Sequence, residues 1–340
     1  MERFDSKGRD VVLSGIRATG SLHLGNYFGA LRHFVSLSLD ETKNCFFFVA
    51  NLHTLTTRTN PEEIKRDLQK IVLDFISVGI NMERAVIFAQ SSVPETCELA
   101  WLLNCVTPVA DLERMPHFKE KKDQKISSCE IVNAGLLTYP VLMAADILGP
   151  RANLVPVGED QHPHVELARE LARRFNLLFG ETFPIPQLLE SEAVRVPGLD
   201  GTGKMGKSDQ NTIDLADTRE IVNKKFAQAV TDPARKRRID SGDPSVCNIY
   251  AFHALVSSSE DIRKVSEGCR TAGIGCIECK VIVSRYINDL LAPIQQRRAE
   301  LGEKGKKYAL EILSEGGKKA RSVIAQTVAE AKDKMGVPFY

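Results

Sequence analysis

The sequence lacks any long hydrophobic run, and this absence argues against a membrane-spanning protein. No stretch of about eighteen apolar residues occurs, so no membrane-spanning helix is predicted. Residues 1–5 form no apolar segment of the kind that serves as a secretory signal, and we therefore expect a cytoplasmic protein. The net charge is only +1, so contacts with nucleic acid would have to come from local basic patches. The sequence also contains no internal repeat and no low-complexity tract.

Short apolar segments alternate with amphipathic helices over the first half of the chain. The predicted strands are residues 11–13, 45–50, 85–88 and 154–157, and a helix is predicted to begin at Pro61. This alternation is typical of an α/β fold with a Rossmann-like, doubly wound parallel sheet. From about residue 205 onward only helical patterns recur, which predicts an all-helical C-terminal domain.

The chain of 340 residues has room for about two domains and a sizeable core. We divide it into a catalytic domain (1–204), a helical domain (205–315) and a C-terminal helix (316–340). The last segment is expected to pack back on the catalytic domain.

A glycine-rich turn between a predicted strand and a predicted helix occupies residues 14–27, which we call the first loop. The helix is expected to start near Gly25. Glycines at such a turn let the backbone approach a phosphate, and the helix N-terminus adds N–H donors and a positive dipole end. His23 and Asn26 bring further hydrogen-bonding groups to the same edge. An ordinary βα turn, whose glycines only satisfy dihedral angles, fits the pattern equally well.

A second candidate phosphate-binding segment is residues 201–208, which we call the lysine loop. It matches the G-x-x-x-x-G-K-S pattern of a P-loop, which requires a buried strand before it and a helix starting at its lysine. Pro197 interrupts any preceding strand, and loop-forming residues follow. The P-loop stays the alternative. We favour a mobile loop in which Lys204, Lys207 and Ser208 contact phosphate.

Taken together, the first loop and the lysine loop resemble the HIGH and KMSKS motifs of class I aminoacyl-tRNA synthetases. The chain is most similar to the tryptophanyl-tRNA synthetase family. Blocks typical of that family occur in its order at residues 112–115, 118–121, 135–140, 143–148 and 155–161. Two positions depart from the family pattern: Gly206 replaces the usual serine, and Arg17-Ala18 stands where Gln-Pro is common. Loss of the serine hydroxyl removes one phosphate contact but neither lysine.

This resemblance implies an ATP-dependent tryptophan–tRNA ligase. Tryptophan would be activated to tryptophanyl-adenylate with release of pyrophosphate and then transferred to tRNA(Trp). No protein nucleophile is required, so catalysis would depend on positioning and on stabilising charge, with Mg²⁺ assisting. The implied catalytic residues are His23, Asn26, Lys204 and Lys207. The implied ATP-binding residues are Arg17, Thr19, Gly25, Asn26, Gly158, Asp160, Gln161, Val196, Lys204, Met205, Lys207 and Ser208.

A carboxylate on an otherwise apolar helix face indicates where the amino acid would bind. Tyr139, Met143 and Asp146 follow an i, i+4, i+7 spacing and share one helix face. A carboxylate there needs either a partner in the core or a ligand such as an indole, whose N–H only donates. Tyrosine would also suit it. The resemblance implies that tryptophan is bound by Tyr139, Met143, Asp146, Gln161, His53, Leu13, Val155 and Val157. For His53, a loop histidine without a role is the alternative.

Four of the eight cysteines have the spacing C-x21-C-x6-C-x2-C and form what we call the cysteine cluster: Cys247, Cys269, Cys276 and Cys279. Two thiolates in a C-x2-C step can bind one ion or cluster. The spacing is similar to that of the iron–sulfur branch of the family, with one residue fewer in the first gap. A 4Fe–4S cluster is therefore expected, and Zn²⁺ or free thiols are the alternatives. The neighbouring basic run 235–238 could contact tRNA phosphates or be a solvated charge run.

Three other functions remain open at this point. A tyrosine-specific synthetase would differ in its amino-acid dependence, and a P-loop NTPase would release inorganic phosphate instead of pyrophosphate. An RNA-binding relative without catalytic activity would bind tRNA but activate no amino acid. The resemblance further implies a homodimer.

Overall fold

The computed structural model describes residues 8–57, 60–116, 118–120, 132–190, 194–206 and 210–337. Two predicted site residues, Lys207 and Ser208, lie outside these ranges. Within them, no helix is both long and apolar enough to cross a membrane.

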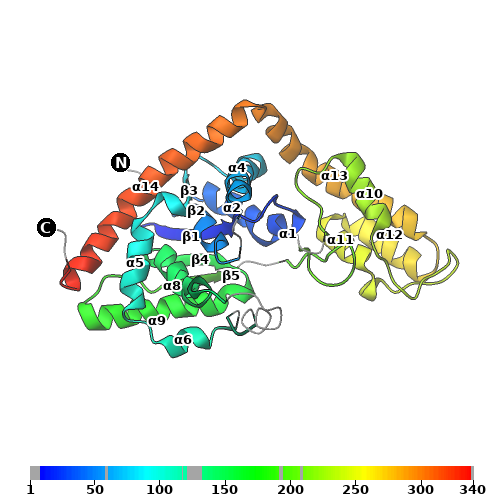
Figure 1. Ribbon diagram of the computed structural model, residues 1–340. Coiled ribbons are helices and arrows are strands. Elements are labelled where there is room, and N and C mark those ends of the chain that lie inside the picture. Colours follow the sequence, from blue (N-terminus) through cyan, green and yellow to red (C-terminus); the bar gives the residue numbers. More distant parts are fainter. Residues whose placement is uncertain are drawn as a thin grey trace.

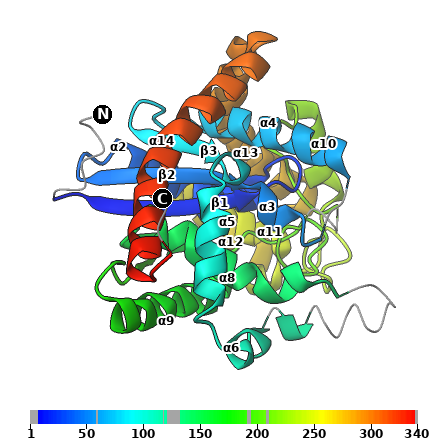
Figure 2. The same cartoon turned by 60° about the vertical axis from the view of Figure 1, so that its left-hand side comes forward.

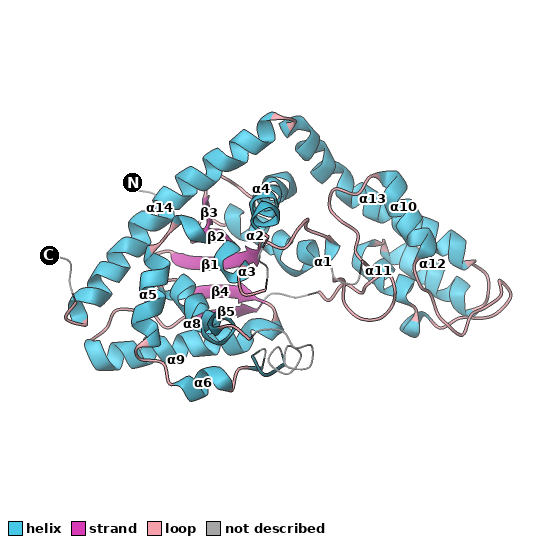
Figure 3. Cartoon of the chain, viewed as in Figure 1, coloured by secondary structure: helices cyan, strands magenta, loops and turns pink. Residues whose placement is uncertain are grey.

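In the described part of the chain, five parallel strands form one sheet in the order β3-β2-β1-β4-β5. The strands are β1 (Asp10–Arg17), β2 (Lys43–Ala50), β3 (Ala85–Ala89), β4 (Leu154–Val157) and β5 (Gln187–Glu190). The chain order reverses between β1 and β4, which makes their carboxyl ends the expected ligand site of a doubly wound sheet. The predicted α/β fold with a Rossmann-like parallel sheet is therefore confirmed (Figure 3).

The central strand β2 shows why both faces of the sheet are covered. Its residues are almost all buried and alternate between two apolar clusters. Cys45, Phe47 and Val49 face the helices α2 (Arg32–Leu39) and α4 (Pro61–Val78). Phe46, Phe48 and Ala50 face α5 (Glu95–Asn104), α8 (Ala134–Leu148) and α9 (His162–Phe179).

Helices make up the C-terminal region, as the sequence predicts. They are α10 (Arg219–Gln228), α11 (Asn248–Val256), α12 (Ser259–Arg270), α13 (Cys276–Leu301) and α14 (Lys304–Lys334). Figure 1 shows α10 to α13 on one side of the molecule and α14 returning along the sheet-containing part. The apolar cluster that contains Phe47 continues through Val222 and Phe252 to Val283, so one core joins the two regions.

Helix α14 lies directly on the edge strand β3 (Figure 2). At the crossing, a Cβ added to Gly316 would lie only 1.8 Å from the carbonyl oxygen of Ile87, so only glycine permits this approach. Ion pairs tie the rest of α14 to α5, one between Arg321 and Glu95 at 2.7 Å. The helix thereby covers a sheet edge that would otherwise be exposed. The predicted boundary at 315/316 falls inside this helix, and the three-part division stays a prediction.

Candidate active site

The strand ends at the reversal point carry the polar residues that the sequence singles out. Arg17 ends β1, and the short helix α3 (Asn51–Thr54) follows β2 directly and carries His53. Gly158 follows β4 and opens the 3-10 turn Glu159–Gln161. These positions meet at the carboxyl edge of the sheet, where open α/β folds bind ligands.

A buried polar network surrounds the Asp146 carboxylate on α8, which is only 6% exposed. The Nε2 atom of His53 lies 2.8 Å from its Oδ2, and the Gln90 side-chain amide donates to both oxygens at 2.9 Å. Burial raises the pKa of Asp146, while the hydrogen bonds from His53 and Gln90 oppose this shift. A carboxylate has about four acceptor positions, so these contacts leave room for one more donor.

The network also fixes the backbone around His53. The side-chain oxygen Oε1 of Gln90 accepts the backbone N–H groups of Leu52 and His53 at 3.0 and 3.2 Å. Sequence reasoning missed Gln90, although its position directly after β3 was a usable signal. His53 therefore has structural partners and is not a loop histidine without contacts.

Tyr139 lies beside this network on the same helix. Its hydroxyl is 2.8 Å from Nε2 of His164, and its ring meets the His53 ring edge-on, with centroids 6.1 Å apart. Burial raises the pKa of Tyr139 to about 12, although the positive charge of Arg17 acts against it. The sequence gives no signal for this contact, because 25 residues separate Tyr139 from His164.

The apolar residues expected around the amino acid belong to one cluster. Leu13 and Val155 are buried in it, and Met143 and Val157 are partly buried against it. Gln161 lies further out, with its amide 3.2 Å from the carboxylate of Asp160. The arrangement offers an apolar wall with polar groups at its ends. The assignment of these residues to tryptophan stays a prediction.

The first loop forms the N-terminus of a helix, as predicted. His23 caps α1 (Leu24–Asn26): its Nδ1 accepts from the Gly25 N–H at 3.1 Å, and its own N–H donates to Asn26 Oδ1 at 3.1 Å. A Cβ at Gly25 would lie 2.8 Å from the His23 ring, so glycine is required for this close approach. The chain then continues through the π-helical turn Tyr27–Leu31 into α2.

The described part of the lysine loop is held by hydrogen bonds from its backbone N–H groups. Met205 N–H donates to the Val196 carbonyl at 3.0 Å, and Gly206 N–H donates to Asn211 Oδ1 at 2.9 Å. Lys204 is exposed, whereas Val196 and Met205 are buried. In the described residues after the loop, no helix begins before α10, so the strand–loop–helix unit of a P-loop is not formed.

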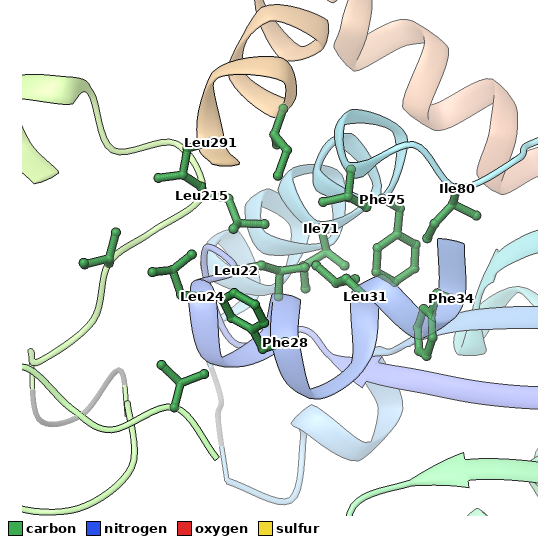
Figure 4. Close-up of a cluster of buried hydrophobic side chains, with 14 of the residues drawn as sticks. Leu22, Leu24, Phe28, Leu31, Phe34, Ile71, Phe75, Ile80, Leu215 and Leu291 are labelled. Carbon is green, nitrogen blue, oxygen red and sulfur yellow. The ribbon is translucent and has the colours of Figure 1, made fainter. Parts of the chain in front are cut away.

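The first loop and the segment after the lysine loop are paired directly. Leu24 N–H donates to the Ile213 carbonyl and Leu215 N–H donates to the Leu22 carbonyl, both at 2.9 Å. Figure 4 shows Leu22, Leu24 and Leu215 gathered in one apolar cluster. The structure thus places the segment after the lysine loop against the first loop, from which it is distant in sequence.

The four thiols of the cysteine cluster are close enough to affect one another. Burial raises the pKa of Cys279 to about 12, and the charges of Cys247, Cys269 and Cys276 contribute to the rise. The Cys279 Sγ lies 3.3 Å from His253 Nε2. Among the described residues, however, no three His, Cys, Asp or Glu side chains are arranged as a metal site.

A buried arginine lies against this cluster. Arg235 Nη1 is 3.8 Å from Cys269 Sγ, and Nη2 donates to the Ile274 carbonyl at 2.6 Å. Its Nε has no hydrogen-bond acceptor in the part of the chain that the structure describes. Arg238 donates to the Gly273 carbonyl at 2.9 Å. Much of the basic run 235–238 is therefore used within the fold.

Several known proteins are similar to this chain over nearly its whole length. The model of the family described as tRNA synthetases class I (W and Y) matches residues 6–292. The tryptophan–tRNA ligase of Deinococcus radiodurans is 44% identical over 328 residues, covering 96% of this chain and 98% of that protein. The corresponding enzyme of Thermotoga maritima is 42% identical over 330 residues, covering 96% and 99%. The tryptophanyl-tRNA synthetase of Campylobacter jejuni, solved with ADP and tryptophan, matches with a TM-score of 0.84 at 34% identity, covering 96% and 99%.

Proposed function

The chain belongs to the class I tRNA synthetases for tryptophan and tyrosine, and from this premise we infer that it is a tryptophan–tRNA ligase. The structural observation that carries the inference is the direct pairing of the first loop with the segment after the lysine loop at the strand ends. A tyrosine-specific activity is the alternative within the family. Both amino acids are therefore included in the test.

The reaction consists of two transfers without a protein nucleophile. A carboxylate oxygen of tryptophan bonds to the α-phosphorus of ATP, and the bond from this phosphorus to the pyrophosphate oxygen breaks. A ribose hydroxyl of tRNA(Trp) then attacks the acyl carbon, AMP leaves, and the hydroxyl proton is released. The chain has to align the reactants and stabilise charge on the leaving groups.

We assign these tasks to the two loops. His23 and Asn26 would orient the phosphates at the helix N-terminus, where the Gly25 backbone permits close approach. Lys204 and Lys207 would act later, when charge develops on pyrophosphate. Mg²⁺ bound to the ATP phosphates would neutralise part of the same charge.

We assign the tryptophan side chain to the network around Asp146. Its remaining acceptor position suits an indole N–H, and Met143 with its apolar neighbours suits the rings. Tyr139 and Gln161 would bind the ammonium group. Arg17, at the end of β1, lies near enough to Tyr139 to influence its pKa and would contact ATP.

ATP–pyrophosphate exchange tests the proposal. Purified protein should exchange label with tryptophan and show neither exchange with tyrosine nor exchange without an amino acid. Exchange with tyrosine alone would show a tyrosine-specific synthetase instead. Release of inorganic phosphate without any exchange would contradict it.

For the cysteine cluster we propose that the four thiolates bind one 4Fe–4S cluster, with Zn²⁺ as the alternative. The support is the donor set together with the buried cation Arg235. Its Nη1 lies 3.8 Å from Cys269 Sγ, and its Nε has no acceptor among the described residues. Four thiolates around either centre would carry net negative charge, which this guanidinium would offset. When bound, the cluster would hold α11 to α13 together, a structural contribution.

The iron, sulfide and zinc content of the purified protein tests the proposed cluster. Protein purified without oxygen should contain about four iron and four sulfide per chain and lose both in the Cys276→Ser and Cys279→Ser variants. One zinc per chain would favour the alternative. Absence of any metal after reconstitution would contradict both.

We further propose that residues 205–315 bind the anticodon region of tRNA and that the protein is a homodimer. Large apolar side chains are exposed on α5 and α9, with Trp101 68% and Leu177 86% accessible. Both helices pack on α8, and Arg174 of α9 donates to the Val106 carbonyl just after the end of α5. A Trp101→Glu variant should run as a monomer in light scattering, whereas the native chain should run as a dimer.

A further inference from the structure

One buried carboxylate joins the first loop to the helical region. Asp74 lies on α4 and is only 2% exposed. Its Oδ2 accepts the N–H of Leu22 at 3.3 Å. Leu22 directly precedes His23, the residue that caps α1. Asp74 therefore holds the backbone at the point where the first loop turns into its helix.

The cation that pairs with Asp74 comes from the far end of α13. Arg298 Nη1 donates to Asp74 Oδ1, and Arg298 lies in the last turn of that helix. The neighbouring Arg297 donates through Nε to the Ser77 carbonyl at 2.6 Å. Two adjacent arginines thus fasten α13 to α4: Arg298 contacts the carboxylate that holds the first loop, and Arg297 contacts the backbone of α4.

The same turn of α13 also holds the segment after the lysine loop. Gln295 Nε2 donates to the Asp217 carbonyl at 2.7 Å, and Asp217 Oδ2 accepts the Asp214 N–H at 2.8 Å. Asp214 is the residue paired with His23 in the bridge between the two segments. Figure 4 shows Leu291 of α13 beside Leu215, in the cluster that also contains Leu22 and Leu24.

We propose that Asp74 and Arg298 are positioning residues for amino-acid activation: α13 sets the place of the first loop through this pair. The proposal rests on the proposed function, because its readout is that reaction. Burying such a pair adds little net stability, since desolvation offsets the attraction. Its effect should therefore appear in the geometry of the loop, where displacements of about 1 Å can cost a hundredfold in rate.

Helix α13 is long enough to connect the Asp74–Arg298 pair with the cysteine cluster. Cys276 and Cys279 lie in the first turns of the helix, and about thirty ångströms separate them from Arg298 at 1.5 Å per residue. A shift of the cysteine-bearing end of α13 would thus be passed to Asp74 at the other end. The pair connects the proposed tRNA-binding region with the nucleotide loops.

The test compares Arg298→Met, Arg298→Lys and Arg297→Met in the full chain. Arg297→Met is the matched control, because it removes a contact between the same helices without touching Asp74. For Arg298→Met we expect kcat of pyrophosphate exchange to fall between about ten- and a hundredfold and KM for ATP to rise. KM for tryptophan should stay within about twofold, since its proposed site is elsewhere. Arg298→Lys should recover most of the rate.

A double-mutant cycle with Asp74→Asn shows whether the arginine acts through the carboxylate. Once Asp74 has lost its charge, Arg298→Met should change kcat by less than about threefold, so the two effects should not multiply. The melting temperature of every variant is measured, so that a loss of stability is distinguished from a loss of rate.

Two results would overturn the proposal. One is an Arg298→Met variant with native kcat and KM, whatever its melting temperature. The other is an Arg297→Met variant with the same loss of kcat as Arg298→Met. If the native chain shows no exchange with any amino acid, the proposed function is wrong. Because the native chain is assayed beside the variants, this failure is distinguished from a failure of the Asp74–Arg298 proposal.

Discussion

The side-chain amide of Gln90 donates to both carboxylate oxygens of Asp146 at 2.9 Å, although 56 residues separate the two in sequence. Gln90 directly follows the last residue of β3, and Asp146 lies on α8. Their contact, together with that of His53, holds a buried acceptor at the carboxyl edge of the sheet. The proposed recognition of an indole depends on this fixed acceptor.

Asp146→Asn should therefore weaken the use of tryptophan. The new amide would place a donor against the donors of Gln90 and His53, so the acceptor would be lost or turned. We expect KM for tryptophan to rise about tenfold or more, as for loss of a hydrogen bond to a charged group. Exchange kinetics at saturating ATP measure it. Ser91→Ala, next to Gln90 but exposed, is the control, and an unchanged KM in Asp146→Asn would refute this role.

Lys207→Ala should slow activation without weakening tryptophan binding. Removing a cation that acts on the leaving pyrophosphate should lower the rate about a hundred- to a thousandfold. Lys204→Ala should act in the same direction. Rapid-quench formation of adenylate gives the rate, and equilibrium binding gives the affinity for tryptophan. Lys224→Ala, an exposed lysine on α10, serves as control. A loss of affinity equal to the loss of rate would argue against the assignment.

Sequence patterns located the sheet and both loops because these depend on local features. The continuous apolar run of β2 and the helical spacing in α8 can be read from neighbouring residues. His164 and Asp74 could not be found in this way, since each gains its role from a partner distant in sequence. The spacing of the cysteine cluster predicts ligands, but spacing alone does not determine which centre they bind.

Gly316→Ala should destabilise the protein through the crossing of α14 and β3. The added Cβ would lie 1.8 Å from the Ile87 carbonyl oxygen, and neither backbone can move without disturbing its element. We expect a loss of about 3 kcal/mol in the free energy of unfolding. Gly29→Ala is the matched control, because its Cβ would meet nothing within 4 Å. Urea denaturation should show a small change for the control; equal effects would contradict the packing argument.

The raised pKa of Tyr139 predicts a loss of stability in alkaline solution. Burial raises this pKa from 10.0 to about 12, so the folded chain keeps a proton that the unfolded chain releases. The contribution of Tyr139 to stability is complete below pH 10 and falls as pH rises toward 12. Urea midpoints at pH 9 and pH 11 should therefore differ less in Tyr139→Phe than in the native chain. In Tyr308→Phe, which alters an exposed tyrosine, the difference between the two urea midpoints should equal that of the native chain. The same difference in Tyr139→Phe as in the native chain would contradict the prediction.

Charging of tRNA(Trp) with labelled tryptophan tests the central claim most directly, because it requires both transfers and both substrates. The account predicts ATP-dependent formation of tryptophanyl-tRNA by the native chain and none with tyrosine or without ATP. A chain that binds tRNA(Trp) but never acylates it, or that acylates a tRNA with tyrosine, would contradict the account.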